Sequence, residues 1–320
     1  MVRSLLLFAA VCVGLLGSTL LSFQAGAAAI ESPPEGTILK ERRDFWMRIY
    51  LALPEAKALV HDTKYPQVVY EELNLQGSSR VRGARVVQGR TRWRKVLFQV
   101  GRQLIKEGGH ADPQRFQDRE RQVYRQWSEV IRKFEGREVE GADFLDAAHR
   151  RRLHVQSGHR EGFAKAFTSS RPLIPAIEEI FRKEGLPVEL ARLPFVESGF
   201  NVKAISKVGA SGIWQLMGPT AQDFIQVSET VDERNNPLRA SFAAAQVLKR
   251  NYESLGTWPL AVTAYNHGRK NLMRIVRQVA SEDPDQVLGT YAGRNLGYSS
   301  SNFYAQFLAV VEAEKSLRFK

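Results

Sequence analysis

The chain has 320 residues, of which 43% are hydrophobic and 25% charged, and these ordinary values exclude a chain that is disordered throughout. Its formal net charge is +12, and residues 30–165 contribute 27 Lys and Arg against 19 Asp and Glu. Basic proteins are attracted to polyanions such as nucleic acid, anionic lipid or an acidic wall polymer, and composition alone does not choose among these.

The first 29 residues have the pattern of an export signal. Arg3 precedes an apolar run over residues 5–23, and a cluster of small residues follows this run. We therefore expect cleavage after Ala27 or Ala29. The alternative is an uncleaved membrane anchor, because the 19 mostly apolar residues 5–23 are just long enough to cross a bilayer.

The single cysteine, Cys12, lies inside this apolar run. Removal of the signal would leave a chain without cysteine, which excludes disulfides, thiolate catalysis and cysteine-ligated metals. Since an exported nucleic-acid-binding protein would be unusual, the expected polyanion is a wall polymer or a membrane surface.

Residues 31–38 have the composition of a linker, and the pattern that follows, up to about residue 165, is helical. Apolar residues recur near helical spacing over 86–105 and again over 116–134. No alternating pattern of any length indicates a strand. We therefore predict an Arg-rich region of antiparallel amphipathic helices over residues 30–157.

The second half is also predicted to be helical, so the fold class is all-α (mainly α). Proline and glycine positions divide it into elements. The predicted helices cover 172–183, 187–198, 237–255, 258–264, 271–280 and 302–317, and a glycine-rich loop covers 208–212.

The residues around Glu197 indicate acid catalysis. Phe195, Val196 and Phe200 flank this carboxyl group near the end of a predicted helix. Apolar surroundings raise the pKa of a carboxylic acid, which lets it act as a proton donor near neutral pH. The alternative is an ordinary glutamate on the polar face of a helix end.

Three short motifs in this half resemble those of the lytic transglycosylase SLT domain, glycoside hydrolase family 23. They are Glu197-Ser198-Gly199-Phe200, Gly212-Ile213-Trp214-Gln215 and Ala264-Tyr265-Asn266. Their order and approximate spacing agree with the family, and the resemblance extends from about residue 159 to about 314. The chain is most similar to the branch of membrane-bound lytic murein transglycosylases that includes MltD, but it lacks the LysM repeats often found there.

The resemblance implies a lysozyme-like catalytic domain over residues 158–320. It also implies cleavage of the β-1,4 bond between N-acetylmuramic acid and N-acetylglucosamine in peptidoglycan glycan strands. Glu197 would protonate the glycosidic oxygen and then accept the proton of the muramyl C6 hydroxyl, which closes on C1 to leave a 1,6-anhydro end. Because this nucleophile is intramolecular, one carboxylate can suffice where ordinary glycosidases use two. The expected location is the periplasm or cell envelope of a Gram-negative bacterium.

The same motifs supply candidate substrate-binding residues. Gln215 and Tyr265 are expected to hydrogen-bond the sugar, and Ser198 to hold the Glu197 carboxylate or the neighbouring loop. Asn266 is expected to brace the site from behind. For Trp214 two interpretations stay open, an apolar wall for a sugar ring and simple core packing.

No cofactor or metal is expected. His149, His154 and His267 form no recognisable set of convergent ligands, and Gly209 and Gly212 lie between helices instead of following a strand.

Three other functions are weighed against transglycosylation. The first is hydrolysis by a goose-type lysozyme-like muramidase, which would need a second acid, and Asp223 is not excluded for that role. The second is a non-enzymatic wall-binding protein, which the presence of Glu197 disfavours. The third is a basic binding surface in residues 40–165 for anionic lipid or the acidic peptide stems of the wall. The sequence leaves protein partners undetermined and indicates no nucleic acid.

Overall fold

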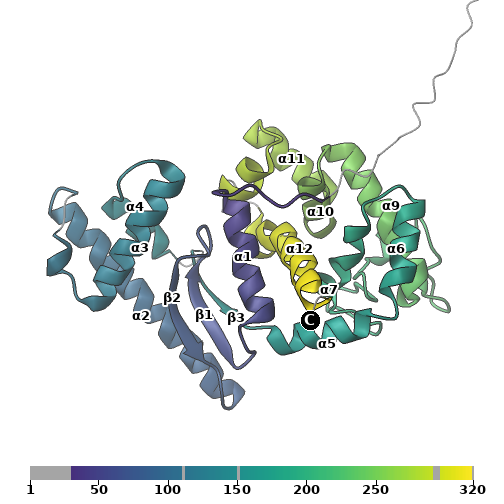
Figure 1. Cartoon of the computed structure of the whole chain (residues 1–320), viewed down its shortest axis with the longest axis horizontal. Coiled ribbons are helices and arrows are strands. Elements are labelled where there is room, and N and C mark those ends of the chain that lie inside the picture. The colour runs from purple at the N-terminus through teal and green to yellow at the C-terminus, as the bar shows by residue number, and fades with distance from the viewer. Residues whose placement is uncertain (1–29, 110–111, 150–151, 291–295, 319–320) are drawn as a thin grey trace, which may run out of the picture.

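The computed structural model describes residues 30–109, 112–149, 152–290 and 296–318, so the expected export signal lies outside the described residues. The described chain is mainly helical, as predicted, and it contains one small sheet (Figure 1). The longer helices are α1 (Ile38–Leu51), α2 (Ser79–Lys106), α3 (Asp118–Glu135), α5 (Arg160–Ser170), α6 (Ile174–Lys183), α9 (Pro237–Leu255), α10 (Trp258–His267), α11 (Arg269–Val279) and α12 (Gly297–Arg318). The short helices are α4 (Gly141–Ala147), α7 (Leu193–Glu197) and α8 (Gly218–Ala221). Single turns at Pro113–Arg115, Val188–Arg192 and Glu233–Asn235 are 3-10 helix, and Asp285–Thr290 is a π-helical turn.

The expectation of an entirely helical first half is wrong, because three strands lie within it. They are β1 (Lys57–Asp62), β2 (Val69–Asn74) and β3 (Leu153–Ser157), and they form an antiparallel sheet in the order β2-β1-β3. All but the first residue of β1 is buried. A strand covered on both faces has no alternation of apolar and polar residues, so the pattern that usually reveals a strand is missing.

The sheet separates two hydrophobic cores. Leu59 of β1 packs into the core that contains α1 and the helices from α5 onward. Its neighbours Ala58 and Val60 point the other way, into a core shared with α2, α3 and α4. Because successive side chains of a strand face opposite sides, one strand contributes to both cores. Figure 1 shows the sheet between α1 on one side and α2 to α4 on the other.

Helix α1 comes early in the chain but packs against residues near the C-terminal end of the chain. Arg42 is buried and donates to the carbonyl oxygens of Leu288 and Ser301, at 2.6 and 3.0 Å. The indole N–H of Trp46 donates to the side chain of Asn302 on α12 at 3.1 Å. α1 is thus part of the core around α12, while the expected division of the chain at residue 158 stays a prediction.

In the described residues, no helix combines the length and the apolar character needed to cross a membrane. The alternative anchor over residues 5–23 lies outside this part of the chain.

Candidate active site

Glu197 is the last residue of α7, a helix of only five residues. The backbone N–H groups of Ser198 and Phe200 both donate to the carbonyl oxygen of Pro194, which closes this short helix. Gly199 and Phe200 then adopt left-handed backbone angles, with φ values of 61° and 57°. Such an angle is costly for a phenylalanine, so the surrounding packing must hold this turn in place.

Aromatic side chains pack beside the turn. The ring of Phe200 meets Phe195 edge-on at 4.7 Å between centroids, and Phe195 contacts Phe163 of α5 at 5.4 Å. Glu197 itself is partly buried. Burial raises the pKa of the Glu197 carboxyl group to about 8. A carboxylic acid with this pKa keeps its proton at neutral pH, which is the property that a general acid needs.

The other end of α7 is held by a buried arginine. Arg192 donates from Nε to the Glu314 carboxylate of α12 at 2.7 Å and also pairs with Glu178 of α6. Its side chain is only 8% exposed. Removing one partner of a buried ion pair leaves an uncompensated charge, so this cluster fixes α7 firmly between α6 and α12.

The second motif forms a loop that folds back against α7. The Ser198 hydroxyl donates to the carbonyl oxygen of Ile213 at 2.9 Å. Gln215, whose φ is 47°, donates from its side-chain amide to the carbonyl oxygens of Ala204 and Gly212, at 3.2 and 2.9 Å. The amide N–H donors of Gln215 are therefore used to hold the loop, which is a role that the sequence did not predict.

Arg234 clamps the same loop from outside. Its Nη1 donates to the carbonyl oxygens of Gly209 and Leu216, while Nε and Nη2 bind the Asp232 carboxylate. Gly212 has a φ of 74°, and a Cβ there would lie 2.0 Å from the carbonyl oxygen of Arg234. None of the three motifs includes Arg234, although it lies within residues 159–314, over which the chain resembles the family.

The third motif meets the second at the end of α10. The Tyr265 hydroxyl donates to the carbonyl oxygen of Trp214 at 2.9 Å. Burial, and then the charge of Glu197, raise the pKa of Tyr265 well above its ordinary value, which keeps the phenol neutral. Asn266 is exposed and accepts a hydrogen bond from Ser300 of α12 at 2.8 Å. The structure thus brings all three motifs together, although they are spread over residues 197–266.

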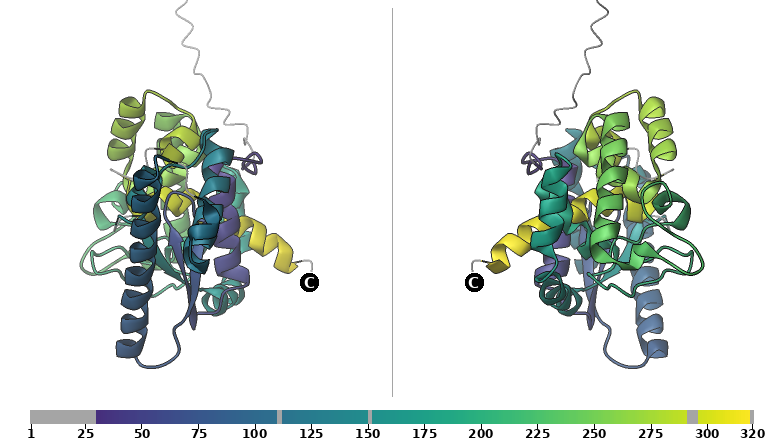
Figure 2. Two further views of the ribbon diagram at one scale, coloured as in Figure 1. Left: turned by 90° about the vertical axis from the view of Figure 1, so that its left-hand side faces the viewer. Right: turned by 90° about the vertical axis from the view of Figure 1, so that its right-hand side faces the viewer.

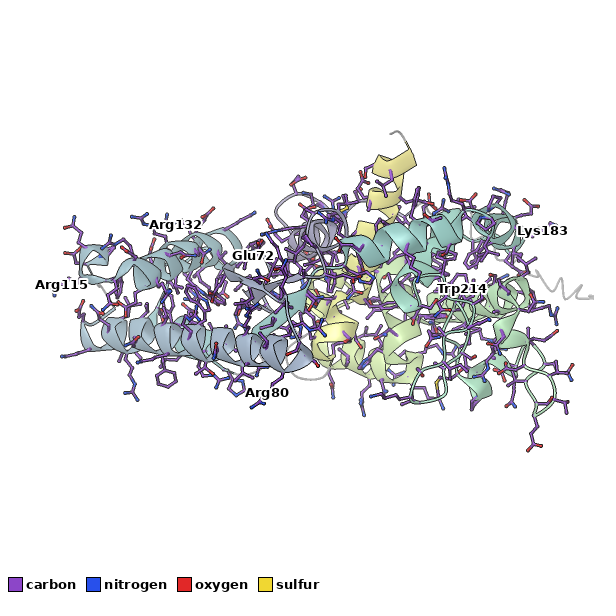
Figure 3. The ribbon with its side chains drawn as sticks, turned by 90° about the horizontal axis from the view of Figure 1, so that it is seen from below. Glu72, Arg80, Arg115, Arg132, Lys183 and Trp214 are labelled. Carbon is purple, nitrogen blue, oxygen red and sulfur yellow. The ribbon has the colours of Figure 1, made fainter. Side chains whose placement is uncertain are left out.

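Of the two interpretations of Trp214, the structure favours core packing. Its side chain is fully buried, stacks on Phe181 of α6 at 5.5 Å between centroids, and donates to the Ser241 hydroxyl at 2.8 Å. Figure 3 shows Trp214 among the packed helices. A side chain in this position has no free face for a sugar ring, so of the two open interpretations of Trp214 this geometry supports core packing and not an apolar wall.

Asp223 and Glu189, which flank Glu197 in the sequence, both lie outside its helix α7. Asp223 is exposed and its carboxylate accepts a hydrogen bond from Arg250 at 2.7 Å. Glu189 lies in the 3-10 turn Val188–Arg192, which precedes α7, so the single helix expected over 187–198 is in fact divided. This arrangement favours Glu197 as a lone acid.

Comparisons with known proteins identify the family of this site. Residues 175–288 match the family described as "Transglycosylase SLT domain", and the match contains Glu197, Gln215 and Tyr265. The chain contains a transglycosylase SLT domain. All three motifs that carried the resemblance lie within the matched SLT domain, which begins in α6 and ends in the π-helical turn.

Curated relatives of the SLT domain support this assignment. The membrane-bound lytic murein transglycosylase D of Escherichia coli K12 is 34% identical over 98 residues, which cover 30% of this chain and 22% of that protein. A putative tributyltin chloride resistance protein of Alteromonas sp. is 31% identical over 115 residues, which cover 35% of this chain and 56% of that protein. The chain thus spans only about a fifth to just over half of the length of these relatives.

Among solved structures, an inactive mutant of the lytic transglycosylase Slt from Pseudomonas aeruginosa is similar at 18% identity and a TM-score of 0.37. The similarity covers 70% of this chain and 37% of that one. At that TM-score the superposition supports no conclusion. The family assignment therefore rests on the sequence matches to the SLT domain.

Proposed function

We propose that the protein is a lytic transglycosylase that cleaves the glycan strands of peptidoglycan, with Glu197 as its catalytic acid and base. The observation that carries the proposal is the placement of this carboxyl group at the end of a short helix in an SLT domain, where burial raises its pKa to about 8. The relatives named as lytic murein transglycosylases support the same substrate.

In the proposed reaction Glu197 begins in its protonated form. It donates its proton to the oxygen of the β-1,4 bond between N-acetylmuramic acid and N-acetylglucosamine, and the bond from that oxygen to C1 breaks. The carboxylate that remains accepts the proton of the muramyl C6 hydroxyl as its oxygen bonds to C1. Glu197 ends protonated again, no water is consumed, and the product carries a 1,6-anhydromuramic end.

An intramolecular nucleophile explains how one carboxyl group serves this reaction. The C6 hydroxyl belongs to the same sugar as C1, so its effective concentration is far above that of a bimolecular reactant. Ordinary glycosidases instead place a second carboxylate near the first. The pairing of Asp223 with Arg250 on the surface supports the one-acid route.

We assign supporting roles to four other residues. The Tyr265 hydroxyl donates a hydrogen bond to a backbone carbonyl, which leaves its oxygen lone pairs to accept from a sugar hydroxyl or N-acetyl N–H. Gln215 and Ser198 hold the loop beside Glu197, and Gln215 keeps its side-chain oxygen for the sugar. Asn266 braces the end of α10 through Ser300. Activity on peptidoglycan also implies export to the cell envelope, in accord with the signal expected over residues 1–29.

The test is digestion of isolated peptidoglycan by the purified protein and by Glu197→Gln. Released fragments are analysed by mass spectrometry, with and without borohydride reduction. Glu189→Gln is the matched control, because it makes the same substitution on the preceding turn outside α7. We expect fragments that lack one water and resist reduction from the unmodified protein and from Glu189→Gln, and none from Glu197→Gln.

Two other outcomes would contradict the proposal. Reducible muramic ends would mean hydrolysis, and Asp223 would then be the first candidate for a second acid. Binding of peptidoglycan without release of any fragment, by all three proteins, would mean a wall-binding domain.

A further inference from the structure

Helix α2 carries a concentration of positive charge that the proposed reaction does not use. Its 28 residues include nine Lys and Arg and no Asp or Glu. Arg92 donates to the Glu71 carboxylate at 2.6 Å, and Arg85 binds backbone carbonyl oxygens. Five exposed cations of this helix have no carboxylate partner in the described part of the chain: Arg80, Arg82, Lys95, Arg102 and Lys106.

The same helix exposes large apolar side chains. Val87 is 64% exposed, Phe98 41% and Ile105 57%. They are separated by 11 and 7 residues, close to three and two helical turns, so all three lie on one side of α2. The opposite side, with Trp93 and Leu104, is buried against the sheet and α4. α2 therefore has one apolar stripe in the core and a second one in water.

Cations are interleaved with this second stripe. Helical spacing places Lys95 and Arg102 beside Phe98, and the guanidinium of Arg102 lies 5.1 Å from the Phe98 ring centroid. We call this surface the outer face of α2 and define it by six residues: Arg80, Val87, Lys95, Phe98, Arg102 and Ile105. Figures 2 and 3 show α2 along the side of the molecule away from the C-terminal end of α12, and Arg80 projects outward there.

We propose that the outer face of α2 binds the surface of an anionic lipid bilayer. Lys and Arg side chains are attracted to anionic headgroups, and apolar side chains between them enter the boundary of the acyl chains. A purely polar polyanion would neutralise the cations but leave Val87, Phe98 and Ile105 in water. Apolar side chains that alternate with cations on one side of a helix are typical of a helix that lies in a membrane interface, and this chemistry favours lipid over sugar or nucleic acid.

The membrane contact is independent of glycan cleavage, because no residue of the outer face belongs to the SLT domain match at 175–288. Binding along α2 would hold the axis of this helix parallel to the bilayer, and the C-terminal end of α12 would point away from the membrane. The apolar run expected over residues 5–23 is a separate route to the membrane, so the test must report on α2 itself.

The experiment places an environment-sensitive fluorophore on the full chain at Thr91→Cys, in a Cys12→Ser background. Thr91 is exposed and lies on the same side of α2 as Phe98. A second protein carries the fluorophore at Gln122→Cys, an exposed position on α3. Each is titrated with vesicles of phosphatidylglycerol and phosphatidylcholine, with vesicles of phosphatidylcholine alone, and with isolated peptidoglycan.

We expect a blue shift of the Thr91 probe with the anionic vesicles only, and no shift of the Gln122 probe. The triple variant Arg80→Gln, Lys95→Gln, Arg102→Gln should raise the lipid concentration for half of the shift on the order of 100-fold, since each cation contributes a factor of about five. Phe98→Gln with Ile105→Gln should raise it roughly 10-fold through lost apolar contact.

The matched control removes the same charge from α3, through substitutions outside the outer face. It should change the lipid concentration for half of the shift by less than about threefold. Its three substitutions are Arg119→Gln, Arg125→Gln and Arg132→Gln. Circular dichroism of each variant establishes that it folds. The proposal is overturned by the absence of a shift at Thr91, by a shift with peptidoglycan but not vesicles, by an equal effect of the α3 control, or by unchanged binding of the apolar double variant.

Discussion

The hydroxyl of Tyr265 donates a hydrogen bond to the backbone carbonyl of Trp214 at 2.9 Å, joining two motifs that are 51 residues apart. The carbonyl belongs to the residue just before Gln215, whose own backbone is strained at a φ of 47°. The bond therefore holds the loop beside Glu197 at the carbonyl that follows Ile213, whose own carbonyl oxygen accepts from Ser198.

Tyr265→Phe should separate activity from stability. The substitution removes one hydrogen bond and leaves the ring in place, so the free energy of unfolding should fall by about 1 kcal/mol. The rate of peptidoglycan cleavage should fall by about tenfold or more, because we propose that the hydroxyl oxygen also accepts a hydrogen bond from the sugar. Denaturant unfolding and turnover assays measure the two effects, and an unchanged rate would remove Tyr265 from the site.

The pKa of Glu197 predicts the alkaline limit of activity. The first step needs the protonated acid, and its pKa is raised to about 8 by burial. The rate constant kcat/KM should therefore decline as the pH rises through about 8. Ser198→Ala should be slower at every pH but keep the same alkaline limb, since burial and not the Ser198 hydroxyl sets this pKa. A rate that keeps rising up to pH 9 would contradict the assignment.

The same pKa predicts that Glu197→Gln stabilises the fold at alkaline pH. The folded-state pKa of about 8 lies above the ordinary 4.5, so between these values the folded state binds more protons than the unfolded state. Stability from this group is fully present below about pH 4.5 and is lost as the pH rises through about 8. Glutamine has no charge to bury. The variant should match the unmodified protein at pH 4.5 and exceed it by about 1–3 kcal/mol at pH 8.5, as measured by urea unfolding.

Alanine substitutions at two glycines of one loop distinguish the stability cost of backbone strain from that of a steric clash. Gly209 and Gly212 both have positive φ, 86° and 74°, but only the second would place a Cβ against the carbonyl oxygen of Arg234, at 2.0 Å. Gly209→Ala should cost about 1 kcal/mol through its backbone angle. Gly212→Ala should cost about 2–4 kcal/mol and should also reduce activity, because the loop must move. Equal costs in thermal and denaturant unfolding would show that the loop relaxes freely.

A buried histidine pair predicts loss of stability in acid. Burial lowers the pKa of His61 to about 3 and of His154 to about 4, and Tyr298 of α12 contacts both rings. The unfolded state therefore binds more protons between pH 6.5 and 4, so stability falls as the pH falls through this window. Between pH 6.5 and 4.5, His154→Gln should lose less unfolding free energy than the unmodified protein, by on the order of 1–2 kcal/mol. Unfolding measurements at the two pH values give this difference. An unchanged slope would show that other groups dominate.

Much of the fold could be predicted from the sequence, because helices reveal themselves through local periodicity. The helices expected over 172–183, 237–255 and 302–317 agree with α6, α9 and α12 to within a few residues. The strands β1 and β2 were not predicted, because contacts with distant parts of the chain hide the alternation of apolar and polar residues that usually reveals a strand. β1 is buried on both faces, and β2 carries Glu71, which accepts hydrogen bonds from Arg92 and Trp93 of α2. Their periods are set by partners that are distant in the sequence.

The sequence by itself determined the mainly helical class, the three motifs, and a glutamate with apolar neighbours, which is the candidate catalytic acid. These depend on residue type and short spacing, which are local properties. Only the tertiary structure decided that Trp214 is a core residue, that the Gln215 amide holds its own loop, and that Arg234 clamps it. It also decided that α1 packs on α12. Each of these facts depends on which side chains meet across long stretches of chain, and burial and hydrogen-bond geometry settle that only when the chain is folded.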